Sequence, residues 1–158
     1  MITLGVISDT HGQLDPCVLT YFQYVDVILH AGDIESVNVI LELQALASVI
    51  AVRGNMDTYG KLARYPEWTV QQFEEICCML THQIGEPAAL RAPLQTIIQK
   101  HAPQLVIFGH THIPYMQQHS QILWFNPGSA SKPRGGSQRS IGRITIQQAE
   151  IHGEILPF

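Results

Sequence analysis

Two histidines separated by one residue, His110 and His112, follow directly after the apolar run LVIFG. Four other apolar, β-branched runs end in the same way, with a side chain that can donate oxygen or nitrogen to a metal ion. One such segment alone would more often be a turn or a polar end of a strand. Five of them in one chain predict a metal site. The candidate ligands are Asp9, His11, Asp33, Asn55, His82, His110 and His112.

The spacing and the number of these residues indicate what they could hold. In 9–11 and in 110–112 the outer residues are two apart, so they should point to the same side of an extended chain. Gly32, Gly54 and Gly109 each precede a candidate ligand, which indicates a sharp turn or close packing there. Two carboxylates, four imidazoles and an amide oxygen are too many ligands for one tetrahedral zinc ion. They suit two divalent ions that share a carboxylate, a pair that can clamp a phosphoryl group and activate water.

The strands that must position these residues begin with three β-branched runs in the first half of the chain. They cover 2–8, 25–33 and 48–55 and are separated by helical patterns. Two successive βαβ units predict a largely parallel sheet covered by helices. Because ligands bind at the carboxyl ends of the strands in such sheets, the candidate ligands should share one rim.

Capping residues locate the two helices between these strands. Asp15 followed by Pro16 is expected to begin one helix, which should run to about Tyr24. Ser36 is expected to cap the other. The apolar side of this second helix is predicted to contain Val37, Ile40, Leu41 and Leu43.

The second half of the chain predicts a further sheet. Residues 67–82 resemble a hairpin that turns near Glu74 and Glu75, and Pro87 is expected to begin a helix that runs to about His101. These elements favour two stacked mixed sheets with helices outside, an α/β fold. The remaining strands are expected at 104–109, 114–119, 121–126, 138–148 and 149–156.

Composition restricts the class of protein. A chain of 158 residues, 46% of them hydrophobic and 14% charged, predicts a single globular domain over 1–158. A net charge of −4 without a basic run makes nucleic acid an unexpected stable partner. The apolar runs are too short to cross a bilayer. Three cysteines form no disulfide framework, so we expect a cytoplasmic protein, and a homo-oligomer stays open.

In order, these segments resemble the calcineurin-like metallophosphoesterases, specifically their small single-domain YfcE-type branch. The resemblance implies a four-layer α/β/β/α sandwich with a dinuclear metal centre. By position, it implies that Asp9, His11 and His112 bind one ion. Asn55, His82 and His110 would bind the other, with Asp33 between the two. The matching motifs are Asp9-Thr10-His11-Gly12, Gly32-Asp33, Gly54-Asn55, His82, Gly109-His110-Thr111-His112, Asn126-Pro127-Gly128-Ser129 and Pro133-Arg134.

The same resemblance implies a metal-dependent phosphodiesterase in which a hydroxide that bridges the two ions attacks phosphorus. Asp33, Asn55 and His110 would then have catalytic roles. Manganese is the expected metal, and zinc, iron, nickel or cobalt would also suit nitrogen and oxygen ligands. Arg53 and Arg134 are candidate contacts to the phosphate of a phosphodiester substrate.

Two positions depart from the family pattern. Gln83 follows the fourth-segment histidine where the family usually has glycine. Met56 follows Asn55 where many relatives have a histidine that assists the leaving group, so good leaving groups should be favoured. The alternatives are a phosphomonoesterase, which Met56 disfavours, and a catalytically weak metal-binding scaffold that resembles the phosphoesterase-like retromer subunit. Catalysis is preferred because all ligand positions keep ligand-type residues.

Three supporting roles are also predicted around the ligands. His30 is expected to hydrogen-bond a metal ligand from outside the metal site. Asp57 should steady the loop that carries Asn55. Asn126-Pro127-Gly128 has the form of a type II turn, with proline and then glycine at its two central positions.

Overall fold

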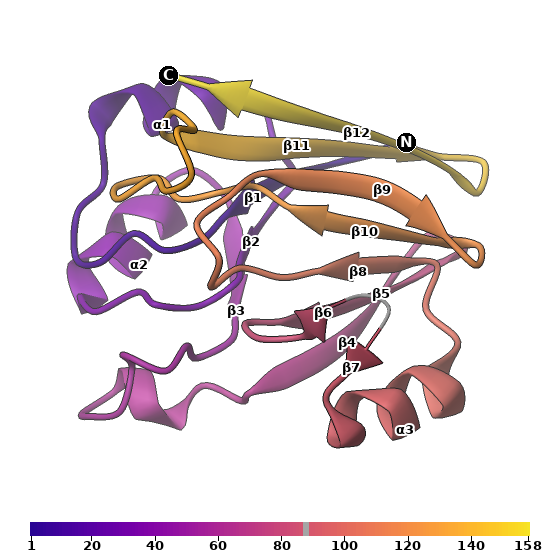
Figure 1. The fold of residues 1–158 in the computed structure, drawn as a ribbon. Coiled ribbons are helices and arrows are strands. Elements are labelled where there is room, and N and C mark those ends of the chain that lie inside the picture. Colours follow the sequence, from indigo (N-terminus) through magenta and orange to yellow (C-terminus); the bar gives the residue numbers. More distant parts are fainter. Residues whose placement is uncertain (87–88) are drawn as a thin grey trace.

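Two five-stranded mixed sheets form the centre of the computed structural model, which describes residues 1–86 and 89–158 (Figure 1). The first sheet contains β1 (Ile2–Ile7), β2 (Val27–His30), β3 (Ser48–Ala51), β11 (Ser140–Gln147) and β12 (Glu150–Pro157). Their spatial order is β12-β11-β1-β2-β3, in which β1, β2 and β3 are parallel. This part of the sheet confirms the two predicted βαβ units.

The second sheet contains β4 (Trp68–Phe73), β5 (Ile76–Thr81), β8 (Leu105–Ile107), β9 (Tyr115–His119) and β10 (Ile122–Asn126). Their spatial order is β4-β5-β8-β10-β9, in which the three middle strands, β5, β8 and β10, are parallel. The predicted hairpin is present as β4 and β5, with its turn at Glu74 and Glu75. Each sheet therefore has a group of parallel strands whose carboxyl ends can present ligands.

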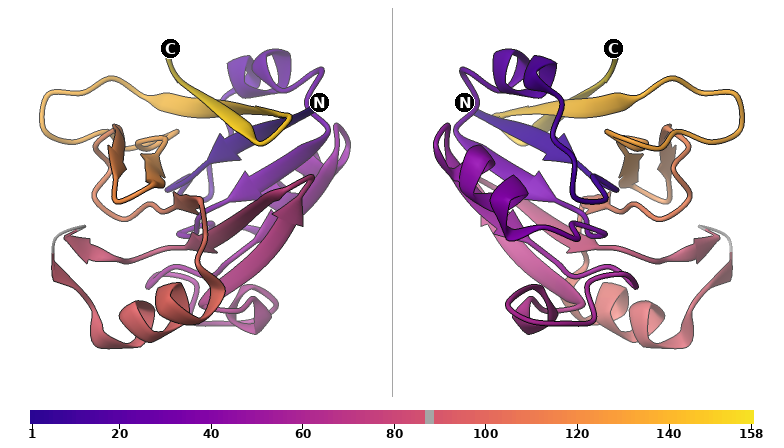
Figure 2. Two further views of the ribbon diagram at one scale, coloured as in Figure 1. Left: turned by 90° about the vertical axis from the view of Figure 1, so that its right-hand side faces the viewer. Right: turned by 90° about the vertical axis from the view of Figure 1, so that its left-hand side faces the viewer.

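The layers follow from which side chains are buried together. Leu4 and Leu29 of the first sheet share a core with Leu80, Ile107 and Phe125 of the second. Helices α1 (Pro16–Tyr21) and α2 (Val37–Gln44) pack on the outer face of the first sheet, and α3 (Ala92–His101) packs on the second. Figure 2 shows α1 and α3 on opposite sides of the two sheets. The predicted α/β/β/α sandwich is confirmed.

Both predicted helix caps are confirmed, and the helix boundaries require corrections. The Asp15 side chain accepts a hydrogen bond from Cys17 N, and the Ser36 side chain accepts one from Asn38 N. Helix α1 ends at Tyr21 rather than Tyr24, because the backbone leaves the helical conformation at Phe22, which has φ −96° and ψ 7°. The Phe22 side chain is buried against the first sheet.

The predicted apolar side of α2 was wrong at one residue. Leu41 is 58% exposed, whereas Val39 is buried beside Ile40 and Leu43. Positions 39, 40 and 43 lie within one turn on one face of a helix, and position 41 is rotated away from them. The apolar character of Leu41 therefore does not show whether its side chain points into the core or into solvent.

The predicted start of the third helix was also wrong. Pro87 itself lies outside the described residues, but β7 (Ala89–Leu90) pairs with β6 (Gly85–Glu86), and α3 begins only at Ala92. A proline does occupy the first turn of α3, and it is Pro93. Proline suits the first helical turn in either place, so this signal alone could not separate the two positions.

Among the described residues, no helix has the length and apolar character needed to cross a bilayer. The three cysteines are free thiols, and Cys78 is buried in the core between the sheets.

Candidate metal centre

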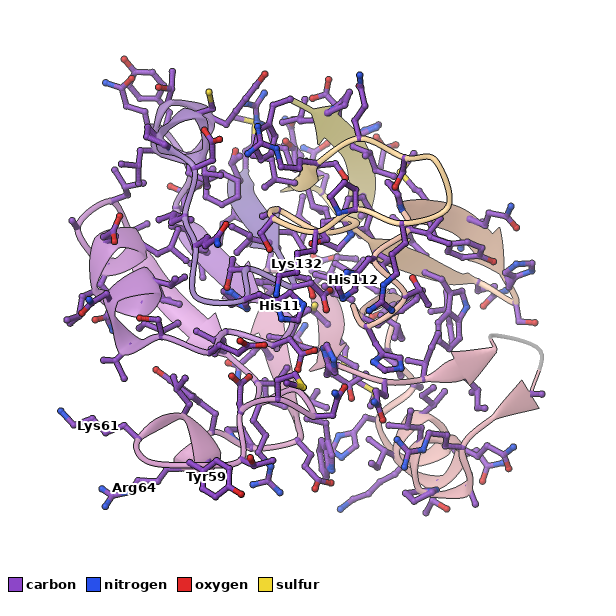
Figure 3. The ribbon with its side chains drawn as sticks, turned by 60° about the vertical axis from the view of Figure 1, so that its left-hand side comes forward. His11, Tyr59, Lys61, Arg64, His112 and Lys132 are labelled. Carbon is purple, nitrogen blue, oxygen red and sulfur yellow. The ribbon has the colours of Figure 1, made fainter. Side chains whose placement is uncertain are left out.

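The seven candidate ligands come together in the loops that follow the parallel strands. Asp9 and His11 follow β1, Asp33 follows β2, and Asn55 follows β3. His82 comes directly after β5, and the pair His110 and His112 follows β8. Figure 3 shows His11 and His112 side by side with Lys132, while Tyr59, Lys61 and Arg64 lie away from them at the edge of the molecule.

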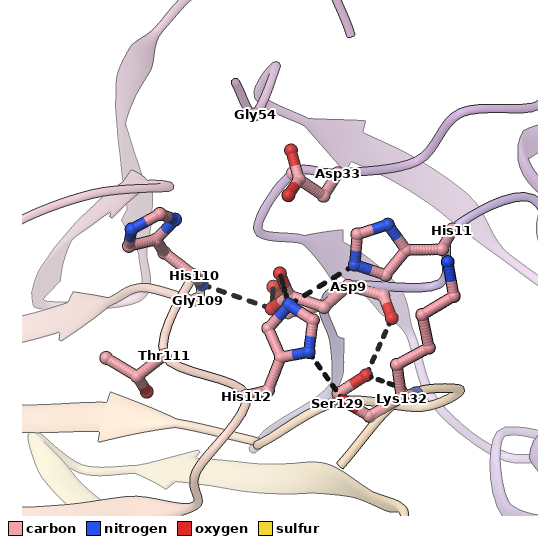
Figure 4. Close-up of polar contacts among 12 residues, drawn as sticks. Asp9, His11, Asp33, Gly54, Gly109, His110, Thr111, His112, Ser129 and Lys132 are labelled. Carbon is pink, nitrogen blue, oxygen red and sulfur yellow. Dashed lines mark hydrogen bonds and ion pairs between the residues drawn. The ribbon is translucent and has the colours of Figure 1, made fainter. Parts of the chain in front are cut away.

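Four of the ligands form a compact group. One ligand atom each from Asp9, His11, Asp33 and His112 lies within 4.8 Å of all the others. The Nε2 atoms of His11 and His112 are 3.2 Å apart, and Nε2 of His112 lies 3.2 Å from Oδ1 of Asp9 (Figure 4). We call these four residues the carboxylate-rich group.

The other three ligands form a second group beside it. Oδ1 of Asn55 lies 3.0 Å from Nδ1 of His110 and 3.2 Å from Nε2 of His82. That Nε2 atom is also 3.4 Å from Oδ2 of Asp33. Asp33 is therefore the carboxylate that lies close to both groups. We call Asn55, His82 and His110 the amide–histidine group.

In three of the histidines, the partner of Nδ1 shows what the other ring nitrogen, Nε2, can bind. Nδ1 of His11 lies 2.5 Å from Oε1 of Glu35, and Nδ1 of His112 lies 2.5 Å from the carbonyl of Lys132. Nδ1 of His82 lies 2.7 Å from the carbonyl of Ala31. Each partner is an oxygen acceptor, so each Nδ1 carries the proton and each neutral ring presents a lone pair at Nε2.

Those lone pairs face other electron-rich atoms, which is the arrangement that a cation stabilises. The two Nε2 atoms of His11 and His112 face each other beside a carboxylate oxygen, Oδ1 of Asp9. That oxygen is the one buried side-chain polar atom in the described part of the chain without a hydrogen-bond partner. A buried carboxylate oxygen of this kind requires a partner. These donors fit divalent metal ions.

The pKa values of the ligands agree with a site that favours positive charge. The carboxylate of Asp9 beside the ring raises the pKa of His112, because it stabilises the protonated imidazole. Burial alone lowers the pKa of His82, but its hydrogen bond to Asp33 and the charges of Asp9 and Asp33 outweigh burial and raise the pKa. Burial likewise raises the pKa of Asp33, and the bond from His82 lowers it overall. Both carboxylates therefore stabilise a cation beside them.

The backbone at the ligands differs from the extended chain that the spacing argument assumed. Asp9, His11, Asp33, His110 and His112 all have a positive φ, between 45° and 72°. Left-handed backbone at residues other than glycine costs about 1–3 kcal/mol each and often occurs at functional sites. The side chains thus converge through tight turns.

Buried polar side chains hold these turns in place. Asp57, as predicted, accepts hydrogen bonds from Gly54 N at 2.9 Å and Ile34 N at 3.0 Å, so one carboxylate joins two ligand loops. Asn126 donates to the carbonyl of Gly109 at 3.0 Å. Gly128 has a φ of 85°, the positive value that the second central position of a type II turn needs.

Close packing of the ligand loops confirms why two of the glycines are needed. A Cβ atom at Gly54 would lie 2.1 Å from Oδ1 of Asp33, and one at Gly109 would lie 2.0 Å from Oγ of Ser8. Neither distance is compatible with a side chain. Any larger residue at Gly54 or Gly109 would displace the adjacent loop.

His30 was predicted to hydrogen-bond a metal ligand, and this predicted partner was wrong. His30 contacts Oγ1 of Thr10 at 3.0 Å and accepts from Gly32 N at 3.2 Å, and thus supports the backbone beside the ligands. Sequence reasoning also missed Glu35, which contacts His11, and Ser129, whose hydroxyl donates to the Asp9 carbonyl at 2.8 Å. Glu35 follows Asp33 at the same spacing of two as the other ligand pairs, and this signal could have identified it.

The two predicted phosphate-binding arginines occupy different surroundings. Arg53 donates to the carbonyls of Ala63 and Tyr65 and to Glu67 at 2.7 Å. It lines a pocket of about 400 Å³ that opens beside the amide–histidine group. Arg134 is exposed, and its backbone N–H contacts the carbonyl of His112.

Comparisons with known proteins agree with this site. The model of the calcineurin-like phosphoesterase superfamily domain matches residues 2–149. A probable metallophosphoesterase of Methanocaldococcus jannaschii is 32% identical over 161 residues, which cover 98% of this chain and 81% of that protein.

Solved structures show the same fold. The phosphoesterase YfcE of E. coli has a TM-score of 0.69 at 30% identity, over 91% of this chain and 88% of its own. Vps29 of Chaetomium thermophilum has a TM-score of 0.79 at 16% identity, over 98% of this chain and 95% of its own. At that identity, the second likeness concerns the fold alone.

Proposed function

Because this chain belongs to the calcineurin-like phosphoesterase superfamily, we propose that it is a metal-dependent phosphodiesterase with two divalent ions in one domain over 1–158. The observation that carries the proposal is the convergence of histidine lone pairs on Asp9 and Asp33. Relatives that carry the name phosphodiesterase, such as YfcE of E. coli, support the choice of a diester substrate.

In this proposal each ligand group holds one ion. The carboxylate-rich group provides Asp9, His11 and His112 for the first ion, the amide–histidine group holds the second, and Asp33 contacts both. When bound, such a pair of ions supplies an activated water molecule and neutralises charge on the phosphoryl oxygens. Manganese is the metal that we propose, since these nitrogen and oxygen ligands accept several divalent ions.

The charges of the chain explain the choice of an anionic substrate. Asp9 and Asp33 contribute two negative charges to a centre in which two divalent ions contribute four positive ones. The centre is thus cationic within a chain of net charge −4, and this favours a phosphate ester at that point of the surface. Arg53 and Arg134, which adjoin the two halves of the centre, are assigned to the phosphate oxygens.

Three residues are assigned catalytic roles. Asp33 keeps its charge at neutral pH, because its pKa is lowered. Oδ1 of Asn55 lies 3.2 Å from Nε2 of His82 and 3.0 Å from Nδ1 of His110, so this oxygen and the two ring nitrogens face one point between them. Burial lowers the pKa of His110, so this ring is neutral at neutral pH and carries a lone pair.

The side chain of Met56 predicts a limit on the leaving group. Met56 is 52% exposed, and its backbone N–H donates to Oδ1 of Asp33 at 2.9 Å. A thioether has no proton to give to a departing oxygen, and general-acid assistance is typically worth about 10²–10⁴-fold in rate. We expect the rate of diester hydrolysis to fall steeply as the pKa of the leaving group rises.

The substitution Met56→His should flatten this dependence, because an imidazole can donate a proton and the backbone contact to Asp33 is kept. Met56→Leu is the matched control and should leave the slope unchanged. The measurement is a series of diesters with graded leaving-group pKa, run on all three proteins. If the rate of the unaltered protein depended only weakly on leaving-group pKa, Met56 would not limit the choice of leaving group.

Acidification should weaken metal binding. The pKa values of His82 and His112 are raised, so in the metal-free protein both rings keep a proton in mildly acidic solution. These protons must leave before metal binds, and affinity should rise with pH by about tenfold per unit for each proton released. Above the raised pKa values the affinity should level off.

Calorimetric titration with Mn²⁺ from about pH 6 to about pH 8, in buffers that differ in ionisation enthalpy, measures both the affinity and the protons released. Constant affinity without proton release across this range would contradict the assignment of His82 and His112 as ligands.

The proposed activity itself is tested with an aryl phosphodiester and an aryl phosphomonoester side by side, with Mn²⁺ and with a chelator. We expect the diester to be hydrolysed faster, and the chelator to abolish the activity. If neither ester were hydrolysed with any divalent ion, the scaffold alternative would replace the enzyme.

A further inference from the structure

Gln83 contacts the amide–histidine group directly. Its Nε2 atom lies 2.9 Å from Oδ1 of Asn55 and 3.2 Å from Nδ1 of His110. Both atoms belong to residues that the proposed function assigns to the second ion. The side-chain amide of Gln83 therefore occupies the hydrogen-bonding positions that a cation would need.

Arg91 fixes which way the Gln83 amide points. Nη1 of Arg91 donates to Oε1 of Gln83 at 2.7 Å. A guanidinium can only donate hydrogen bonds, so its partner must be the amide oxygen, and the amide nitrogen must face Asn55 and His110. An NH₂ group has two hydrogens, one for each of these acceptors.

Within residues 1–86 and 89–158, no side-chain amide contacts the carboxylate-rich group in the way that Gln83 contacts the other. The atoms of the carboxylate-rich group include Oδ1 of Asp9, which has no hydrogen-bond partner, and a carboxylate of Glu35 stands behind His11. Two ligand carboxylates, Asp9 and Asp33, attract a cation there. The amide–histidine group shares Asp33 but adds only neutral donors, and the cationic Arg91 stands next to its competitor Gln83.

We propose that Gln83, held by Arg91, competes with the second metal ion for Asn55 and His110, so that the two ions bind with unequal affinity. The first ion enters the carboxylate-rich group. The second binds only when the Gln83 amide leaves its two acceptors. This inference rests on the proposed two-ion centre. It predicts that metal concentration controls the occupancy of the second position, because the second ion binds more weakly than the first.

The test is a calorimetric titration of metal-free protein with Mn²⁺. The unaltered protein should show two binding steps, the second weaker. Gln83→Ala removes the competing amide and should strengthen the second step by about fivefold to tenfold, the change that corresponds to one ordinary hydrogen bond. The first step should not change. Arg91→Ala frees Gln83 to rotate and should shift the second step in the same direction.

Gln118→Ala is the matched control, because Gln118 is exposed on β9, and it should leave both steps unchanged. If the second Mn²⁺ bound with the same affinity to the unaltered protein and to Gln83→Ala, the proposed competition would be overturned. The two-ion centre would remain intact. A stoichiometry of one Mn²⁺ per chain in every variant would overturn both the two-ion centre and this inference.

Discussion

Replacement of Asp33 by asparagine is expected to abolish hydrolysis and to lower metal content more than any change outside the seven ligands. Asp33 is only 2% exposed, and it lies next to His82 while sharing a compact group with Asp9, His11 and His112. Asparagine keeps the size of the side chain and removes the charge that both ions need. Changing a residue that merely supports a metal ligand lowers metal affinity or activity by about 10–100-fold. Because Asp33 is itself a proposed ligand, the loss of turnover here should exceed about 100-fold.

The matched control for this change is Asp26→Asn. Asp26 precedes β2, whereas Asp33 follows it, and Asp26 instead accepts a hydrogen bond from Thr3 N at 2.7 Å. The control should keep its metal and its turnover. Metal analysis and hydrolysis of an aryl diester should be measured on both variants. Near-normal turnover with two ions in Asp33→Asn would refute the role of Asp33.

Gly54→Ala should also inactivate the protein, although it alters no ligand. The added Cβ would lie 2.1 Å from Oδ1 and 2.3 Å from N of Asp33, so the Asp33 loop or the Asn55 loop must move. Overpacking of a tight site costs about 1–3 kcal/mol in unfolding free energy. We expect that loss together with a large drop in metal affinity and turnover.

Gly60→Ala separates the two effects of the Gly54 change. A Cβ at Gly60 meets nothing within 4 Å, but the backbone there has a φ of +66°. Left-handed backbone costs an alanine about 1–2 kcal/mol, so the two variants should be destabilised to a similar degree. Only Gly54→Ala should lose metal. Urea unfolding and calorimetric titration measure both quantities, and normal Mn²⁺ affinity in Gly54→Ala would contradict the tight packing of the two loops.

The candidate ligands could be grouped from the sequence because each follows an apolar run that was expected to form a strand. A parallel sheet places the ends of such strands at one rim, so the convergence of Asp9, Asp33 and Asn55 after β1, β2 and β3 followed from topology. Their meeting with His112, which follows β8 of the other sheet, depends on how the two sheets stack. The helix N-caps could also be predicted from the sequence, since Asp15 and Ser36 offer a side-chain oxygen just before a helix.

Other features depend on contacts between loops, which no local pattern encodes. The positive φ of Asp9 and His112 could not be anticipated, because residues other than glycine rarely adopt it without tertiary support. The contact of Gln83 with Asn55 joins loops that follow β3 and β5, on two different sheets. The start of α3 at Ala92 was missed because two prolines carried the same signal.

The central claim is that two metal ions are held on either side of Asp33, and diffraction from crystals grown with Mn²⁺ tests it most directly. Anomalous scattering locates manganese independently of any assumed ligand. The account predicts two peaks, one among Asp9, His11 and His112 and the other among Asn55, His82 and His110, with Asp33 in contact with both. A single peak at saturating Mn²⁺, or two peaks that Asp33 does not join, would contradict it.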